Sequence, residues 1–252
     1  MTSRPPRSGS ELLELIAAHR SVRAFLDQEP PQADIQRAIA AAQMASTSSH
    51  LQCYHLLRVR SAEQRAALVE LCGGQPWIKD AGAFFVVLAD LRRLDLAAAL
   101  HGQLQVHNFE SFLVAVIDAA LFAQNLALAF EAQGYGICFI GGLRNRLAEV
   151  DRLLEVPAGL LPLFGCCVGR PAEPGEPRPR LPLAAVFSDG RFSDPDAQRA
   201  AIGAHDQAML AWNQAQGRPG RDWSRGVARK GAQAWRVGLA DFYRSKGAVL
   251  DG

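Results

Sequence analysis

The sequence predicts an α+β protein with a three-layer α/β/α arrangement around a central mixed sheet. Two observations carry this prediction. Segments with the three-to-four-residue apolar spacing of helices alternate with short, continuous apolar runs as far as residue 169. The longest apolar segment, 112–133, is also long enough to be a helix buried in the centre. With 252 residues, 49% apolar and 21% charged, the composition is that of a soluble globular protein with a sizeable core.

The first half of the chain predicts three helices and two strands. Ser10 is a plausible N-cap for the first helix, which leads directly into the basic segment His19-Arg20-Ser21-Val22-Arg23. The run AFFVVLAD lacks alternation, so we expect this strand to be buried on both faces. The predicted helices cover 10–18, 32–44 and 62–72, and the strands cover 54–60 and 83–90.

The second half begins with the long apolar helix. Residues 112–130 nearly match the length of a transmembrane span, but Asp118, Gln124 and Asn125 interrupt the segment and no basic cluster flanks it. We therefore expect a central helix of a soluble protein rather than a membrane helix. Beyond it the sequence predicts strands over 137–140 and 161–168, with a helix over 147–154 between them.

The organisation changes after Arg170. Residues 171–182 are rich in Pro, Gly and charge and predict an extended arm. Residues 196–216 and 224–246 look helical but polar, with too little apolar surface for an independent domain. We expect a flexible tail over 1–10, a core over 11–170, and an extension over 171–252 that packs on the body or on a second subunit.

Composition excludes several classes of function. A net charge of +2 gives no reason to expect a nucleic-acid or membrane partner. The five cysteines and six histidines show no metal-ligand spacing, so no metal is expected, and the apolar surroundings of Cys138, Cys166 and Cys167 predict buried reduced thiols. The first ten residues lack the apolar segment of a signal peptide, so the expected compartment is the cytoplasm.

Two basic clusters remain as candidates for binding an anion. The motifs of serine hydrolases, P-loop proteins, zinc proteases and Rossmann folds are absent. Arg20 and Arg23 could form bidentate contacts with a phosphate, although a solvated basic turn explains the same residues equally well. The pair Arg178 and Arg180 lies in the proline-rich arm, and both clusters could close on one phosphate, which spacing alone does not establish.

Seven motifs then occur in the order typical of one family. The sequence resembles the nitroreductase family from Glu11 to Lys246, specifically its group A, the oxygen-insensitive NADPH nitroreductases and related flavin reductases. No single motif is specific, but their order is. They are HRSVRAF (19–25), STSSHLQC (46–53), GGQ (73–75), AQN (123–125), FIGGLRN (139–145), LPLFGCCVG (161–169) and PRLP (179–182).

The resemblance implies a nitroreductase-like fold and a homodimer. Two FMN molecules would lie at the subunit interface, and the C-terminal extension would wrap around the partner. Arg20 and Ser21 would face the FMN phosphate, whereas Arg23 would reach the ribityl chain and the pyrimidine edge. The remaining cofactor-binding residues implied by the family are His19, Gln75, the backbone of Ile140, Gly141 and Gly142, and Arg178 and Arg180. Ser48 and Ser49 would also approach the cofactor, from the other subunit.

The sequence also departs from the family pattern. His50 stands where relatives often carry an apolar aromatic residue beside the substrate, which puts the substrate range in doubt. His50 could also protonate a reduced substrate, although a lone loop histidine is more often a bystander. A loose similarity around GRDWSRG makes Arg218 and Arg221 candidates for the 2′-phosphate of NADPH.

The function expected from the resemblance is FMN-dependent reduction of nitroaromatics or quinones by NADPH, in a ping-pong two-electron cycle. No catalytic side chain is required, because the flavin carries the hydride at N5. One alternative is an NAD(P)H:flavin reductase that supplies free reduced FMN. A second alternative, from a different class, is a sensor that binds flavin or nucleotide without catalysis. The physiological acceptor and the preference for NADPH over NADH do not follow from the sequence.

Overall fold

The computed structural model describes residues 9–173 and 175–251. The chain divides into two compact units. The larger unit comprises the chain up to Gly175 together with the residues from Arg236 onward, and the smaller one is Glu176–Trp235. The sequence placed everything after residue 170 in one extension, whereas the last residues of the chain group with the larger unit.

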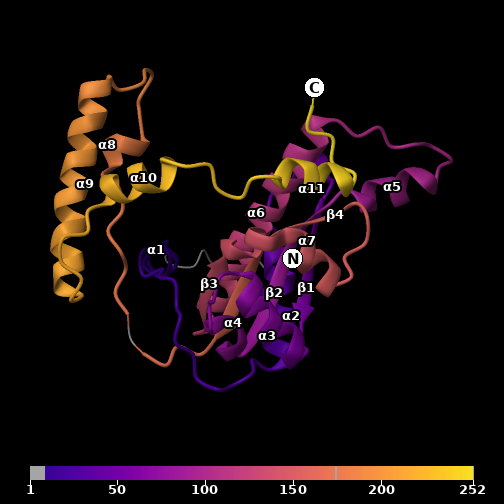
Figure 1. Cartoon of the computed structure of the whole chain (residues 1–252), viewed down its shortest axis with the longest axis horizontal. Coiled ribbons are helices and arrows are strands. Elements are labelled where there is room, and N and C mark those ends of the chain that lie inside the picture. The colour runs from indigo at the N-terminus through magenta and orange to yellow at the C-terminus, as the bar shows by residue number, and fades with distance from the viewer. Residues whose placement is uncertain (1–8, 174, 252) are drawn as a thin grey trace. The chain divides into compact units, whose positions relative to one another are not determined.

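One four-stranded sheet forms the centre of the larger unit (Figure 1). Its order is β1-β2-β4-β3, where β1 is Tyr54–Val59, β2 is Ala83–Asp90, β3 is Gly136–Ile140 and β4 is Leu160–Gly169. All three strand pairings are antiparallel. The predicted mixed sheet is therefore corrected for the named strands: within residues 9–173 and 175–251, parallel pairing is confined to one isolated bridge, between Ser21 and Ile137. Continuous apolar runs show only that both faces are covered, and do not distinguish parallel from antiparallel strands.

Helices cover both faces of this sheet, as the three-layer prediction required. Neighbouring residues of a strand point to opposite faces, so the side chains of Cys166 and Cys167 in β4 lie on opposite sides of the sheet. Burial raises the pKa of both thiols. Among the charges that also act on them, Glu131 of α6 (Phe109–Glu131) acts on Cys166, and Arg65 of α3 (Ala62–Leu71) acts on Cys167.

The long helix α6 is buried on one side and exposed on the other. Asn108 begins it through a capping box with Ser111. Its inner side packs on the sheet and on α2 (Gln32–Ala42). Its outer side exposes a row of large apolar side chains: Phe109, Leu113, Ile117 and Leu121. Among the described residues α6 is the one helix long and apolar enough to cross a bilayer, but its packing on the sheet is that of a core helix.

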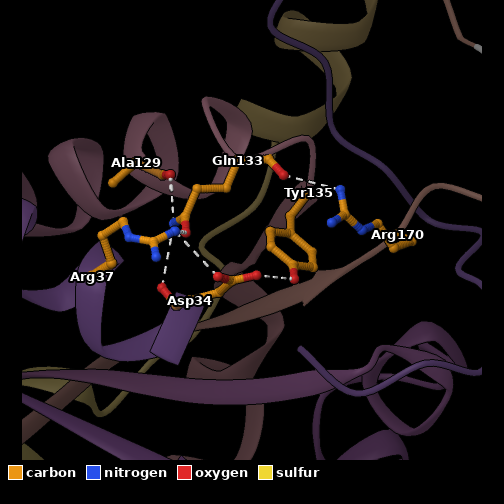
Figure 2. Close-up of polar contacts among 6 residues, drawn as sticks. All are labelled: Asp34, Arg37, Ala129, Gln133, Tyr135 and Arg170. Carbon is orange, nitrogen blue, oxygen red and sulfur yellow. Dashed lines mark hydrogen bonds and ion pairs between the residues drawn. The ribbon is translucent and has the colours of Figure 1, made fainter. Parts of the chain in front are cut away.

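A polar network fixes the chain where α6 ends and β3 begins (Figure 2). The Tyr135 hydroxyl donates to Asp34 of α2 at 2.7 Å, and Gln133 Nε2 donates to the backbone oxygens of Asp34 and Ala129. Arg170, which follows β4, donates to the Gln133 carbonyl at 2.9 Å and stacks on the Tyr135 ring. The network therefore ties α2, α6 and the end of β4 together.

The predicted elements are found within a few residues of their expected ends, with two kinds of difference. The expected helix over 224–246 is two helices, α10 (Trp223–Gly231) and α11 (Leu239–Ser245), because Arg236 and Gly238 adopt positive φ and interrupt it. Several elements were not expected, namely α4 (Trp77–Asp80), α5 (Arg92–Ala99), α8 (Leu183–Val186) and the 3₁₀ turns η1 (Ser48–His50) and η2 (Gly141–Arg146). The remaining helices are α1 (Gly9–Ala17), α7 (Leu147–Leu153) and α9 (Pro195–Ala215).

The smaller unit is built on α9, against which α8 and α10 pack (Figure 1). Asp194 caps the start of α9 by accepting from the backbone N–H groups of Asp196 and Ala197. Farther along α9, the Asp206 carboxylate accepts from the N–H groups of Trp223 and Ser224. These contacts fix the start of α10 on α9, and the Ser224 hydrogen bonds lower the pKa of Asp206.

Candidate functional site

The basic segment runs along the edge strand β3. Ser21 forms a parallel bridge with Ile137, and Val22 N–H donates to the Ile137 carbonyl at 2.8 Å. Val22 is buried, whereas Ser21 and Arg23 on either side are exposed. The close approach requires Gly136, since a Cβ there would overlap the Val22 side chain. The backbone thus fixes the segment while its polar side chains face outward.

Two side chains of the segment have defined partners within the larger unit. The guanidinium of Arg23 lies 5.7 Å from the centroid of the Trp77 ring, a cation–π contact. Burial raises the pKa of the Cys138 thiol, and the Arg23 charge opposes that effect. His19 Nδ1 lies 2.7 Å from Glu131 Oε1 at the end of α6.

The glycine turn after β3 packs directly on Gln75. Gln75 Nε2 donates to the Cys72 carbonyl at 2.8 Å. A Cβ on Gly142 would overlap both the Cys72 oxygen and Gln75 Nε2, so this turn admits only glycine at that position. The predicted contact of Gln75 with a flavin stays a prediction. In the structure the side-chain amide of Gln75 donates its hydrogen bond to the Cys72 carbonyl.

Two arginines that sequence reasoning did not assign lie beside Gly141. A Cβ built on Gly141 would be 3.5 Å from Arg144 Nη2 and 3.9 Å from Arg236 Nη1. Arg236 Nε donates to Asn145 Oδ1 at 3.0 Å, and Arg144 donates to the Leu163 carbonyl, which a β-bulge leaves outside the strand ladder. Burial and the neighbouring Arg144 lower the pKa of Arg236. The motif FIGGLRN includes Arg144 and could have pointed to it. No motif in the sequence marks Arg236.

The loop that carries Ser48, Ser49 and His50 is fixed to α6 by hydrogen bonds to the Asp118 carboxylate. Ser49, His50 and Gln52 all adopt positive φ, which is strained for residues other than glycine. The fully buried Asp118 carboxylate accepts from the N–H groups of Ser48 at 3.0 Å and Cys53 at 3.1 Å. Sequence reasoning treated Asp118 only as an interruption of an apolar helix. A buried carboxylate needs hydrogen-bond donors, so an acidic residue within an apolar helix could have indicated that Asp118 binds backbone N–H groups.

The smaller unit contains a basic cavity of about 850 Å³. Arg218 and Arg221, the predicted nucleotide-binding residues, both line it. The aromatic ring of Trp212 is contacted by two arginines, with Arg178 at 5.2 Å and Arg218 at 5.4 Å from its centroid. The charged side chains of the cavity wall are Arg178, Arg218, Arg221, Asp222, Arg225, Arg229 and Lys230.

The structure places part of the predicted flavin site along β3 and directly after it. Ser21 and Val22 of the basic segment pair with Ile137 of β3, the turn Gly141–Gly142 follows the last residue of the same strand, and Gln75 packs on Gly142. The loop 48–50 is a separate feature: none of the hydrogen bonds found among residues 9–173 and 175–251 joins it to residues 19–23. Arg178 and Arg180 belong to the smaller unit, where Arg180 donates to the Arg178 carbonyl at 2.7 Å.

The residues gathered at β3 have the chemistry that FMN requires. Arg20 and Arg23 supply permanent positive charge for a phosphate or an electron-rich ring edge. Gln75 supplies an amide, and the Gly141–Gly142 turn carries no side chains of its own. A planar, anionic cofactor with polar edges fits this donor set.

Comparisons with known proteins agree over nearly the whole chain. Residues 16–170 match the nitroreductase family, and residues 178–251 match the C-terminal domain of that family. The "FMN reductase (NADPH)" of Bacillus subtilis is 37% identical, over 93% of this chain and 97% of its own. The "Oxygen-insensitive NADPH nitroreductase" of Salmonella typhimurium is 34% identical, over 94% of this chain and 98% of its own.

A solved structure with its nucleotide is similar throughout. The NADPH:FMN oxidoreductase of Vibrio harveyi complexed with NAD+ superposes with a TM-score of 0.86 at 33% identity, covering 95% of this chain and 99% of that one. Both matched regions, the ordered motifs and the superposition lead to one assignment. The chain belongs to the nitroreductase family.

Proposed function

We propose that this protein is an FMN-dependent NADPH oxidoreductase that reduces nitroaromatics or quinones by a ping-pong two-electron mechanism. The observation that carries the proposal is the placement of the predicted residues along β3: Ser21 and Val22 pair with Ile137, the Gly141–Gly142 turn follows the last residue of the strand, and Gln75 packs on that turn. Relatives named FMN reductase and NADPH nitroreductase support the same chemistry. The flavin, when bound, supplies hydride transfer between NADPH and the acceptor.

The chain's own residues bind and orient the cofactor. Arg20 and Ser21 would hold the phosphate, and the contacts of Arg178 and Arg180 with FMN stay predictions. Arg23 would place its charge near the pyrimidine edge, where it stabilises negative charge. Gln75 and the backbone of Ile140, Gly141 and Gly142 would contact the polar ring edge. Arg144 and Arg236 add positive charge beside the same turn.

The nucleotide donor is proposed to bind through the basic cavity of the smaller unit. Arg218 and Arg221 would contact the 2′-phosphate of NADPH, which NADH lacks. Replacing both by alanine should raise the KM for NADPH by about tenfold or more and leave the KM for NADH nearly unchanged, because charge-assisted hydrogen bonds are lost only with the phosphate. An equal effect on both nucleotides would contradict this assignment.

We also propose a cytoplasmic homodimer. The exposed apolar row on α6 suits a second copy of the chain, and the five buried free thiols suit a reducing compartment. In the dimer, Ser48 and Ser49 would approach the flavin of the other subunit. His50 is exposed at the same loop, with Gln52 Nε2 3.2 Å from its Nε2, and would contact the substrate.

The central experiment is the visible spectrum of the purified protein, followed by anaerobic stopped-flow reduction with NADPH and with NADH. We expect bound flavin and rapid bleaching by NADPH. A protein that neither carries nor binds flavin would overturn the proposal. Flavin without oxidation of either nucleotide, whichever acceptor is supplied, would instead identify a sensor.

The second candidate is an NAD(P)H:flavin reductase. The observation that favours it is the name of the Bacillus subtilis relative, an FMN reductase. Steady-state turnover with added FMN, compared with turnover on a nitroaromatic, separates the two. A higher kcat/KM for added FMN would favour the flavin reductase.

A further inference from the structure

Glu131, the last residue of α6, is joined to the first residue of the basic segment. Its Oε1 lies 2.7 Å from His19 Nδ1, although the two residues are 112 positions apart. The side chains are 10% and 28% exposed, respectively. We propose that Glu131 is a positioning residue of the flavin site: it holds the His19 imidazole in one orientation and one tautomer. This inference rests on the proposed function, in which His19 contacts FMN.

The chemistry of the pair determines the tautomer. An ionised carboxylate can only accept hydrogen bonds, so Nδ1 of His19 carries the proton. In the neutral ring, Nε2 is then left as the acceptor, as when a carboxylate fixes the ring of a metal-binding histidine. The ring cannot flip without breaking the contact with Glu131. Nε2 therefore always takes the position away from α6.

The carboxylate is mounted on a fixed part of the molecule. Gln133, two residues farther along, belongs to the network of Figure 2, which anchors the end of α6 to α2 and to Arg170. Glu131 itself takes no part in that network. Its Oε2 is buried and has no hydrogen-bond partner among residues 9–173 and 175–251. Its one hydrogen-bond partner among the described residues is His19, so the buried carboxylate serves that ring.

The contact is not needed to hold the backbone of the segment. His19 N–H donates to the Ile16 carbonyl at 3.2 Å, and Val22 N–H donates to the Ile137 carbonyl at 2.8 Å. The main chain is therefore fixed on both sides of His19 without Glu131. What Glu131 adds is the orientation of the ring, which is the property that a ligand contact through Nε2 requires.

Two substitutions separate orientation from charge. Glu131→Gln keeps an oxygen that can accept from Nδ1–H, whereas Glu131→Met keeps the size of the side chain and removes the acceptor. We expect the Met variant to raise the FMN dissociation constant about tenfold and the Gln variant by less than about threefold, since one buried hydrogen bond is at stake. Nitrogen NMR of His19 should show the Nδ1–H form in the wild type and in the Gln variant, and a mixture in the Met variant.

The chain offers a matched control. His107 Nε2 and Asp95 Oδ1 form a second histidine–carboxylate pair, also at 2.7 Å. Asp95→Asn should leave FMN affinity unchanged. A wild-type chain that binds no FMN would refute the proposed function itself. A wild type that binds FMN, with a Met variant of equal affinity or a Gln variant as weak as the Met variant, would refute only the role of Glu131. If the Met variant does not fold, the NMR spectrum of the wild type still decides: a His19 ring protonated at Nε2 instead of Nδ1 would refute the role of Glu131.

Discussion

Single residues decide the geometry around β3, and Gly142 is the tightest of them. A methyl group there would overlap the Cys72 carbonyl and the Gln75 amide. We expect Gly142→Ala to cost about 2 kcal/mol of unfolding free energy, the usual penalty of overpacking, and to weaken FMN binding as Gln75 moves. Urea denaturation and FMN titration measure the two effects.

Gly203 provides the matched control for that substitution. It lies inside α9, and a Cβ there would meet nothing within 4 Å. Gly203→Ala should therefore stabilise the protein by about 0.5 to 1 kcal/mol, because alanine is the better helix former. If Gly142→Ala were as well tolerated as Gly203→Ala, the close packing of the glycine turn would be wrong.

Asp118 decides the shape of the loop that carries Ser48, Ser49 and His50. Asp118→Ala leaves the N–H groups of Ser48 and Cys53 without their acceptor, so we expect a loss of about 3 kcal/mol in unfolding free energy. Asp118→Asn keeps one acceptor and should cost about half as much.

The control for Asp118 is Glu110, an exposed acid in the first turn of the same helix. Glu110→Ala should cost less than about 1 kcal/mol, the value of a favourable interaction with the helix dipole. Limited proteolysis provides a second measurement, because a released loop should be cut near residue 50. A stable Asp118→Ala variant with an uncut loop would show that the loop holds its shape by itself.

At the residue scale, the sequence shows the chemistry of a side chain but not which residue it will contact. HRSVR and the Gly141–Gly142 pair could be chosen as candidates from the sequence, because ordered motifs mark them. Arg236 could not, since its place beside Gly141 depends on how the polar segment after Trp235 returns to the sheet. The partnership of His19 and Glu131 is equally invisible, because nothing in a sequence specifies a pair that is 112 residues apart.

At the scale of the elements, the residue before β1, the C-cap of α3 and the helix α11 each carry a buried thiol or phenol that loses its proton only at high pH. Burial raises the pKa of Cys53 to about 11, of Cys72 to about 12 and of Tyr243 to about 12. These groups stay protonated in the folded chain while the unfolded chain already loses protons near the ordinary thiol value of 9.0. The contribution of these groups to the unfolding free energy should therefore be constant well below pH 9 and fall as the pH rises from 9 through 11.

The size of this alkaline loss follows from the linkage. One pH unit above its ordinary pKa, each thiol that remains protonated in the fold costs about 1.4 kcal/mol. Denaturant titrations at pH 8, 9 and 10 measure the slope. Cys53→Ala should make the slope shallower by the share of one thiol. An unchanged slope in that variant would mean that Cys53 ionises in the folded chain as readily as in the unfolded one.

The elements themselves could be predicted where local pattern decides them. The run 83–90 is a strand because its apolar side chains fill both faces, and the structure buries every residue of it. The pairing of the strands could not be predicted, since continuous apolar runs suit either direction. The break between α10 and α11 was also hidden, because it depends on a positive φ at Arg236, a residue type that ordinarily continues a helix.

At the scale of the whole molecule, α6 raises the question of what covers its outer side. Phe109, Leu113, Ile117 and Leu121 are each 40–47% exposed, at intervals of four residues that place them on successive turns. The sequence predicted a helix buried all round. In the single chain it is buried on one side, so a second copy is what would complete the burial. A contiguous exposed apolar row of this kind is the surface that the proposed homodimer would cover.

The test is the assembly state of variants at Ile117, in the middle of that row. Ile117→Asp places a charge where the proposed interface would bury it, at a cost of several kcal/mol, so about a hundredfold or greater loss of dimer affinity is expected. Ile117→Val keeps an apolar side chain and should remain dimeric. Sedimentation velocity across a concentration series measures both. If the proposal is correct, the Asp variant should also release FMN, because Ser48 and Ser49 would no longer reach the other subunit's flavin. A wild type that is monomeric at micromolar concentration, or an Asp variant that dimerises like the wild type, would place the interface elsewhere.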